Sequence, residues 1–162
     1  MIEKCDKILM IIDNNNKTFG KDYDNMDYEM IRQKRNLGSK FAHHLGIEVV
    51  EIGEGYAKAE LEVQDYFENM VHSLHGGILY TLADATGGAA TTSHGKPMTT
   101  VNCDFHYLRA GINVKKLTAI GKMIKDGKKF GIVEVEVFDE KEVLLAKGTY
   151  TFYYLENSTE TK

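Results

Sequence analysis

The sequence predicts an α+β protein in which one long central helix packs against a mostly antiparallel sheet of about six strands. Three observations support this fold class. Residues 69–95 form an almost uncharged stretch with helical periodicity, about six other stretches alternate apolar and polar residues, and the chain contains no internal repeat or low-complexity linker. At 162 residues, the chain is long enough to bury a sizeable core as one domain.

The central helix is predicted from the segment between Glu68 and Lys96, in which Asp84 is the only formal charge. Its apolar residues recur at intervals of three and four: Ile78, Leu79, Leu82, Ala85, Ala89 and Ala90. A helix with so little polar surface belongs in a core. The small residues over 87–90 would let other backbone approach closely, so we expect a wrapped helix.

Asp84 is a lone carboxylate in this apolar helix. Burying an ionised carboxylate is costly, so we expect Asp84 to have a partner, a raised pKa or a chemical role. The alternative is that it faces a water-filled edge of the core.

Two glycines, Gly76 and Gly77, stand at the start of this helix, directly after His75. Glycine disfavours helix, but it lets a ligand approach bare backbone. The first N–H groups of a helix have no internal partner and carry a partial positive charge, which suits an anion or a developing oxyanion. Gly76 and Asp84 would lie roughly 12 Å apart along one helix axis, which is far for joint action on one bond. If both serve one site, two antiparallel chains would supply them, and a homodimer follows from that condition.

Residues 1–37 are predicted to form a helical extension, with one short helix from Cys5 to Ile12 and a second over 24–35. The extension could cap the domain, add to a subunit contact or be partly mobile, and it is too short and too acidic for a DNA-reading helix-turn-helix. Ser39 should begin a further short helix that Gly46 ends.

The strands are predicted by period-2 alternation on both sides of the central helix. A hairpin is expected over 47–53 and 55–63, followed by strands near 98–109, 116–126, 129–139 and 143–154. In the strand near 98–109, alternation places Val101, Cys103, Phe105 and Tyr107 on one face and Thr100, Asn102, Asp104 and His106 on the other. The domain organisation expected is an extension over 1–37, a core domain over 38–156 and a tail over 157–162.

Composition excludes several classes of protein. A net charge of −4 and a pI near 5.9 argue against nucleic-acid binding. Cys5 and Cys103 have no disulfide or metal spacing, and the apolar run over 8–12 is too short to span a membrane, so we expect a cytoplasmic protein without a membrane segment. His72 and His75 lack a third ligand of suitable type nearby, so no metal is expected. Phosphate-binding glycine loops and the serine-hydrolase elbow are also absent from the sequence.

One set of residues resembles a known family. Asn69, the triplet at 75–77 and Leu82-Ala83-Asp84 are similar to the N-x(5)-HGG-x(4)-LAD signature of the hotdog-fold acyl-CoA thioesterases, in the phenylacetate-pathway (PaaI-like) branch of the 4-hydroxybenzoyl-CoA thioesterase superfamily. The similarity extends from about residue 44 to 153 and includes the segments 105–110 and 145–149. It implies a hotdog fold and hydrolysis of a short-chain, medium-chain or aromatic acyl-CoA. No cofactor is implied, since coenzyme A is part of the substrate. It also implies a homodimer with the site at the subunit interface, and pairing of such dimers into a homotetramer.

The resemblance also implies roles for individual residues. Asp84 would act as general base on water or as nucleophile on the thioester carbonyl. The Gly76 N–H, helped by Gly77, would hold the oxyanion. Asn69 would orient water or the carbonyl, or else cap a turn in its loop. His75 would either donate to the substrate or fix its loop by hydrogen bonding to backbone.

Three further positions are implied more indirectly. Thr100 aligns with a family Ser or Thr that helps to hold the attacking water. Thr99 would take this role if the register slips by one. The alternative is that Thr100 is present only because threonine favours strands. Arg109 matches a basic family position, beside Ala110 where the family has a proline that tightens the turn. Lys128 belongs to a group of cations that could bind the coenzyme A phosphates or form a solvated face: Arg109, Lys115, Lys116, Lys122, Lys125, Lys128 and Lys129.

Two other functions remain open at this point. A hotdog domain can serve as a non-catalytic acyl-CoA-binding sensor, which loss of the acidic residue and a DNA-binding segment would favour. A hotdog hydratase or dehydratase would carry an Asp/His pair in a different motif, whereas the triplet at 75–77 with Asp84 fits the thioesterases better.

Overall fold

The computed structural model describes residues 26–155, and the predicted helix between Cys5 and Ile12 and the predicted tail over 157–162 lie outside this range. The elements are α2 (Tyr28–Gly38), α3 (Lys40–Leu45), β1 (Glu48–Gly53), β2 (Tyr56–Glu62), the short 3-10 helix η2 (Asp65–Phe67), α4 (Gly76–Thr92), β3 (Met98–Tyr107), β4 (Lys116–Asp126), β5 (Phe130–Asp139) and β6 (Leu144–Tyr154). The predicted helices and strands of this part of the chain are confirmed to within a few residues.

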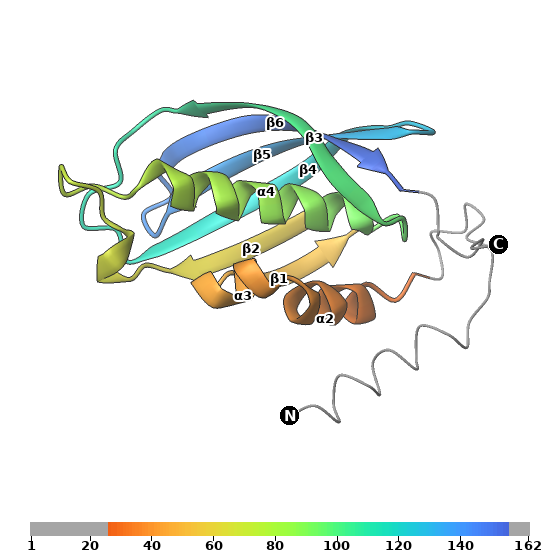
Figure 1. Cartoon of the computed structure of the whole chain (residues 1–162), viewed down its shortest axis with the longest axis horizontal. Helices are drawn as coiled ribbons and strands as arrows, with labels where there is room; N and C mark the ends of the chain where they lie inside the picture. Colours follow the sequence, from red (N-terminus) through yellow and green to blue (C-terminus); the bar gives the residue numbers. More distant parts are fainter. Residues whose placement is uncertain (1–25, 156–162) are drawn as a thin grey trace.

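The six strands form one antiparallel sheet in the order β1-β2-β4-β5-β6-β3. The central helix α4 lies across one face of this sheet, and α2 and α3 lie alongside β1 (Figure 1). The strands β1 and β3 therefore form the two edges. This arrangement confirms the predicted α+β class with one long helix against an antiparallel sheet.

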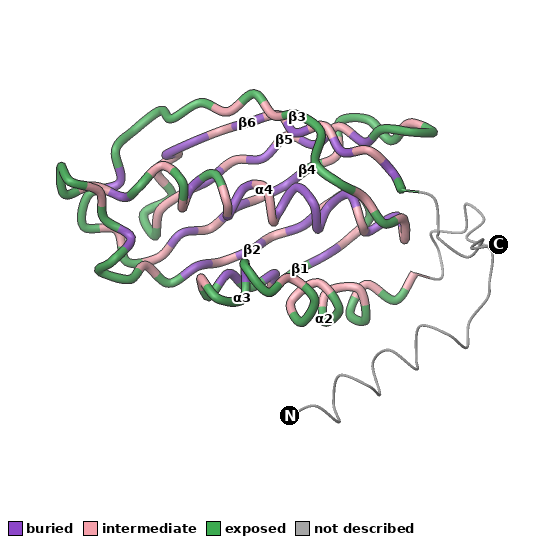
Figure 2. Tube along the Cα trace, in the orientation of Figure 1, coloured by how far each residue is buried: buried purple, intermediate pink, exposed green. Residues whose placement is uncertain are grey.

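The core lies between α4 and the inner face of the sheet, and Figure 2 shows that both α4 and the strands contain buried stretches. The alternation predicted for β2 is confirmed, since Ala57, Ala59 and Leu61 are buried while the residues between them are not. Two buried threonines of α4, Thr86 and Thr91, donate to the carbonyls four residues earlier, at 2.7 and 2.9 Å. Their hydroxyls are therefore satisfied within the helix.

Glycine allows α4 to approach the sheet closely. A Cβ at Gly87 would stand 3.2 Å from side-chain atoms of both Phe152 and Val135, and one at Gly121 on β4 would stand 3.3 Å from the Thr86 carbonyl oxygen. Such contacts are tighter than ordinary van der Waals packing. The expectation of a wrapped helix with small residues at its contacts is confirmed.

The strand β3 departs from the predicted alternation. Its pairing with β6 shifts register between Thr100 and Asn102, because the strand holds one extra residue at Val101. The bulge turns Thr100 to the inner face, which it shares with Cys103. The prediction that these two side chains face opposite ways is wrong, since strict period-2 counting holds only on an unbulged strand.

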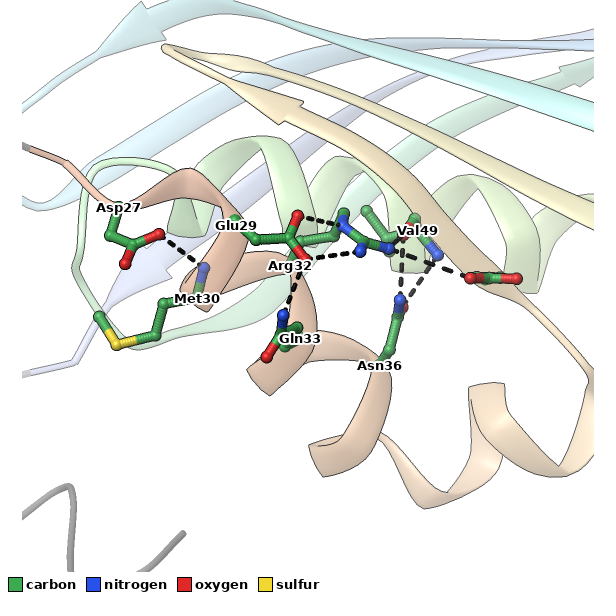
Figure 3. Close-up of polar contacts among 8 residues, drawn as sticks. Asp27, Glu29, Met30, Arg32, Gln33, Asn36 and Val49 are labelled. Atoms are coloured by element: carbon green, nitrogen blue, oxygen red, sulfur yellow. Dashed lines mark hydrogen bonds and ion pairs between the residues drawn. The ribbon is translucent and has the colours of Figure 1, made fainter.

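Polar side chains attach α2 to the edge strand β1 (Figure 3). Asp27 caps the helix by accepting a hydrogen bond from the Met30 N–H at 2.9 Å. Asn36 donates to the Val49 carbonyl at 3.0 Å and accepts from the Val49 N–H at 2.9 Å, while Arg32 donates to the same carbonyl. An edge strand leaves backbone groups unpaired, and α2 satisfies those of Val49.

The short helix α3 begins after Ser39 and ends at Gly46, whose φ of 82° is left-handed, as predicted. Among residues 26–155, no helix is both long enough and apolar enough to cross a membrane.

Candidate active site

The first turn of α4 is capped by the side chain of His75. The Nδ1 atom of His75 accepts a hydrogen bond from the Gly77 N–H at 3.0 Å. Because Nδ1 is the acceptor, the neutral ring carries its proton on Nε2, which leaves that N–H as a donor. His75 can therefore either donate to a substrate through Nε2 or fix its loop through Nδ1. The hydrogen bond formed in this structure is the second of these, the cap on the Gly77 N–H.

The same contact separates the two glycine donors. The Gly77 N–H is engaged by His75, whereas the Gly76 N–H has no hydrogen-bond partner among the described residues. Gly76 is the first residue of α4, where backbone donors lack partners within the helix. The free donor predicted at this helix start is therefore Gly76, and the expectation that Gly77 helps it does not fit the hydrogen bond to His75.

Tyr107 of β3 explains why residue 76 is a glycine. The Tyr107 hydroxyl donates to the Gly76 carbonyl at 3.2 Å, and a Cβ at Gly76 would stand 3.0 Å from the Tyr107 ring. The ring therefore packs directly on the backbone of the first helical turn. A side chain at this position would press against the ring and force it to shift.

A pocket of about 350 Å³ opens beside Gly76. Apolar residues of the loop, α4 and β3 form much of its wall, together with Asn69 and Arg109. Its lining residues are Asn69, Leu74, Gly76, Leu79, Tyr107, Leu108, Arg109, Ala110 and Gly111. A mainly apolar pocket with a few polar groups at a helix start is a typical ligand site.

Asn69 lines this pocket, but its side chain is engaged with its own loop. Its Oδ1 atom accepts from the Val71 and Ser73 N–H groups at 3.0 and 3.2 Å, and its Nδ2 donates to the Ser73 hydroxyl at 2.9 Å. These are the contacts of the turn-capping alternative. In this structure Asn69 shapes the loop that forms the pocket wall.

Asp84 lies two turns further along α4 and is partly buried. Its Oδ1 accepts a hydrogen bond from the Thr100 hydroxyl at 2.9 Å. Burial raises the pKa of Asp84 above its usual range, against the opposing effects of the Thr100 hydrogen bond and the positive charge of Arg35. The partner and the raised pKa expected for this carboxylate are therefore both present.

These contacts form a line along α4 and β3, which we call the α4–β3 seam: Gly76 with Tyr107, Tyr80 with Cys103, and Asp84 with Thr100. The helical members are four residues apart and therefore share one face. The Cys103 thiol donates to the Tyr80 hydroxyl at 3.3 Å, and this contact together with burial raises the pKa of Tyr80 to about 12. Tyr80 is thus a neutral phenol between the two ends of the seam.

The two predicted phosphate-binding cations lie at opposite ends of the molecule. Arg109 lines the pocket at the start of α4 and donates to the Leu144 carbonyl at 3.0 Å. Lys128 lies in the β4–β5 turn, and Asp126 at the base of that turn pairs with His94 just beyond the end of α4, at 2.8 Å. A 17-residue helix is roughly 25 Å long, so one chain does not bring both cations to one ligand.

Residues 26–155 contain no group of three His, Cys, Asp or Glu side chains that could hold a metal. His72 instead lies 3.5 Å from Glu68, on the surface of the loop.

Three residues of the site were missed in the sequence. Tyr80 and Tyr107 complete the seam, and an aromatic residue four positions from Asp84 was a usable signal for the first of them. Arg35, from α2, acts on Asp84 across a gap of 49 positions in the chain, and periodicity gives no signal for such a contact.

Comparisons with known proteins give consistent results. A family model described as the thioesterase superfamily matches residues 72–146. The chain is 30% identical over 105 residues to the acyl-coenzyme A thioesterase PaaI of Escherichia coli, covering 65% of this chain and 75% of that protein. It is 32% identical over 123 residues to an Archaeoglobus fulgidus protein whose name assigns it provisionally to the esterases, covering 75% of this chain and 80% of that one.

Solved structures give the same picture. The E. coli PaaI protein, from the phenylacetic acid degradation operon, superposes with a TM-score of 0.76 at 24% identity, covering 82% of this chain and 96% of that one, a likeness that concerns the fold alone. A Streptococcus mutans protein solved with bound acetyl-CoA has a TM-score of 0.65 at 27% identity and covers 68% of this chain and 90% of that one.

Proposed function

Since the chain belongs to the thioesterase superfamily and has the hotdog fold, we propose that it hydrolyses an acyl-CoA thioester to a free acid and coenzyme A. The observation that carries this proposal is the pairing on α4 of a free backbone donor, the Gly76 N–H, with a partly buried carboxylate, Asp84. The names of the relatives and the acetyl-CoA bound to the S. mutans protein support the same substrate class.

In the proposed reaction, the thioester carbonyl oxygen accepts a hydrogen bond from the Gly76 N–H, which stabilises the negative charge that develops there. Acting as base, Asp84 takes a proton from water while the water oxygen bonds to the carbonyl carbon. The tetrahedral intermediate then collapses, the C–S bond breaks, and the coenzyme A thiolate leaves and takes up a proton. With Asp84 as nucleophile, the carboxylate oxygen attacks the same carbon, and the C–S bond breaks to release the coenzyme A thiolate, which takes up a proton. Water then hydrolyses the resulting mixed anhydride to the free acid and the Asp84 carboxylate.

The geometry supports a site shared between two chains. Gly76 and Asp84 are eight residues apart on α4, so one helix holds them roughly 12 Å apart. A second copy packed antiparallel would bring the Gly76 N–H of one protomer to the Asp84 carboxylate of its partner. The unpaired edge of β3 and its exposed apolar residues, Val101, Tyr107 and Leu108 at its end, support this face as the contact, with a homotetramer as the further assembly proposed.

The shared site would also reconcile the positions of Arg109 and Lys128. Antiparallel packing brings the first turn of one α4 toward the later turns of the other. Arg109 of one protomer and Lys128 of its partner would then lie at the same end of the assembly, where coenzyme A phosphates could reach both. A cytoplasmic location remains an expectation from the sequence.

The test is release of free thiol from a panel of short-chain, medium-chain and aromatic acyl-CoAs. We expect Asp84→Ala to lower turnover by roughly 10²- to 10⁴-fold, while Asp104→Asn, which alters an exposed carboxylate on the outer face of β3, leaves turnover unchanged. Equal turnover in Asp84→Ala and the unaltered protein would remove Asp84 from the mechanism. Binding of acyl-CoA by calorimetry without any thiol release would favour a sensor instead.

A further inference from the structure

The guanidinium of Arg35 crosses from α2 to the central helix. Its Nη2 donates to the Ala85 carbonyl at 3.3 Å, next in the chain to Asp84. A Cβ at Gly88 would stand 2.8 Å from the same nitrogen, so the absence of a side chain there leaves room for the guanidinium. Arg35 therefore lies on the turn of α4 that carries Asp84.

The charge of Arg35 is buried with few partners. Its Nε is buried and has no hydrogen-bond partner among the described residues. Burial lowers the pKa of Arg35, and the negative charge of Asp84 opposes that effect. A buried cation is costly unless an opposite charge is near, and Asp84 is the carboxylate that acts on it.

The groups that face Asp84 come from α2, β3, β6 and α4 itself. Arg35 and the Thr100 hydroxyl stabilise the ionised carboxylate. The phenols of Tyr80 and Tyr150 also interact electrostatically with Asp84. The Cys103 contact and burial raise the pKa of Tyr80, and burial raises the pKa of Tyr150, so both phenols stay neutral. Arg35 is therefore the one cation acting on Asp84 within residues 26–155.

The helix that carries Arg35 is held firmly in place. Asn36, the next residue, forms two hydrogen bonds with the backbone of Val49, and Arg32 contacts Val49 and Glu29 (Figure 3). These contacts direct one side of α2 to β1. Arg35 projects from a neighbouring side, and its contacts with Ala85 and Gly88 are to α4.

We propose that Arg35 is a positioning residue for Asp84: supplied by α2, it lies across α4 and holds the Asp84 carboxylate in its charged form within an apolar site. The proposal deepens the proposed function and rests on it, since an ionised Asp84 is what either base or nucleophile requires. It assigns a role to the N-terminal extension, whose contribution the sequence left open.

The experiment compares the pH profile of kcat/KM for the unaltered protein with those of Arg35→Met and Arg35→Lys. The position of the acidic limb of this profile reports the pKa of the essential base in the free enzyme. We expect Arg35→Met to move that limb to higher pH with little change in KM, and Arg35→Lys to restore it because the positive charge returns. The matched control is Arg32→Met, which removes an arginine of the same helix that faces β1, and it should leave the limb in place.

A second measurement does not depend on turnover. The Asp84 side-chain carboxyl, assigned in ¹³C NMR spectra by its absence in Asp84→Asn, is titrated in each folded variant. Titration at higher pH in Arg35→Met than in the unaltered protein and in Arg32→Met supports the proposal, even if Asp84 proves to have no catalytic role.

Three outcomes would overturn it. The Asp84 titration could be the same with and without Arg35, or it could move equally in Arg32→Met. A raised KM at every pH with an unmoved acidic limb would instead make Arg35 a ligand contact. If Arg35→Met does not fold, Arg35→Gln and Arg35→Lys are compared in its place, and identical titration in these two would overturn the proposal.

Discussion

Burial makes the Asp84 carboxylate harder to ionise than an exposed aspartate, and Thr100 and Arg35 offset only part of that effect. The net pKa is raised in the folded chain. A carboxyl group whose folded pKa exceeds its unfolded value stabilises the fold in its protonated state, below the unfolded pKa, and that stabilisation is lost as the pH rises through the folded pKa. The residue proposed to perform the chemistry therefore destabilises the protein at neutral pH.

The destabilising effect of the ionised carboxylate leads to a prediction for Asp84→Asn. The amide is neutral at every pH and keeps an oxygen that can accept from Thr100, so the variant should melt at a higher temperature than the unaltered protein at pH 7.5 or above. The difference should shrink toward acidic pH, where Asp84 itself is protonated. Thermal melts of both proteins across this range make the comparison.

Asp104→Asn serves as the control in the same melts, because its carboxyl is exposed on the outer face of β3. An Asp84→Asn protein that is no more stable than the original at neutral pH would contradict the sign derived for this carboxyl.

At the scale of elements, the first turn of α4 combines a structural cap and a proposed catalytic donor within three residues. His75 accepts from the Gly77 N–H, which leaves the Gly76 N–H open to the pocket. The cap and the donor can be separated experimentally, since a different acceptor at position 75 would keep the helix start while removing the imidazole.

We therefore expect His75→Ala to lower the free energy of unfolding by about 1 kcal/mol, the usual cost of losing an N-cap acceptor. His75→Asn should recover most of this loss because asparagine is a preferred N-cap residue. Denaturant titrations measure both values. Turnover then decides the role left open: if His75→Asn is stable and fully active, the imidazole fixes the loop, and if it is stable but slow, the imidazole also donates to the substrate.

The element scale also shows what the sequence could predict. The long apolar helix and the alternating strands followed directly from periodicity, and the free donor followed from a glycine pair at a helix start. The orientation of Thr100 toward the inner face could not be predicted, because a single extra residue at Val101 reverses the alternation and the residue pattern does not indicate this bulge. The engagement of Gly77 was likewise hidden, since it depends on the side-chain orientation of His75.

Contacts between distant segments were the least predictable. Asp84 could be recognised as a residue in need of a partner, but nothing in the amphipathic pattern of residues 24–35 indicates that Arg35 is one of the groups that supply it. Two elements must first be placed in space before such a contact can be seen.

At the scale of the whole molecule, the shared site predicts complementation between two inactive variants. Asp84→Ala keeps the donor, and Gly76→Val keeps the carboxylate but places a branched side chain beside the N–H of residue 76, where it obstructs the approach of a carbonyl and presses on the Tyr107 ring. Alone, each should be nearly inactive. Coexpressed in equal amounts, they should form mixed dimers in half of all cases, each with one intact site, and so recover about a quarter of the original turnover.

Thiol release from the unseparated coexpressed pair measures this recovery, and purification through a tag on each chain in turn, which keeps only the mixed dimers, should raise it to about half of the original turnover. Coexpression of Asp84→Ala with Asp84→Asn is the control, because no mixed dimer of these two contains an intact carboxylate. No recovery from the first pair, with mixed dimers present, would place both groups of each site in one chain.

The position of α2 in the chain has a consequence for how such a protein can evolve. Arg35 precedes the segment that matches the thioesterase superfamily, residues 72–146, and lies on a helix that does not line the pocket beside Gly76. If Arg35 sets the charge of Asp84, the acidity at which the enzyme works can drift through changes in this helix alone. Adaptation to a new cellular pH and adaptation to a new acyl group would then follow separate mutational routes, neither of which constrains the other.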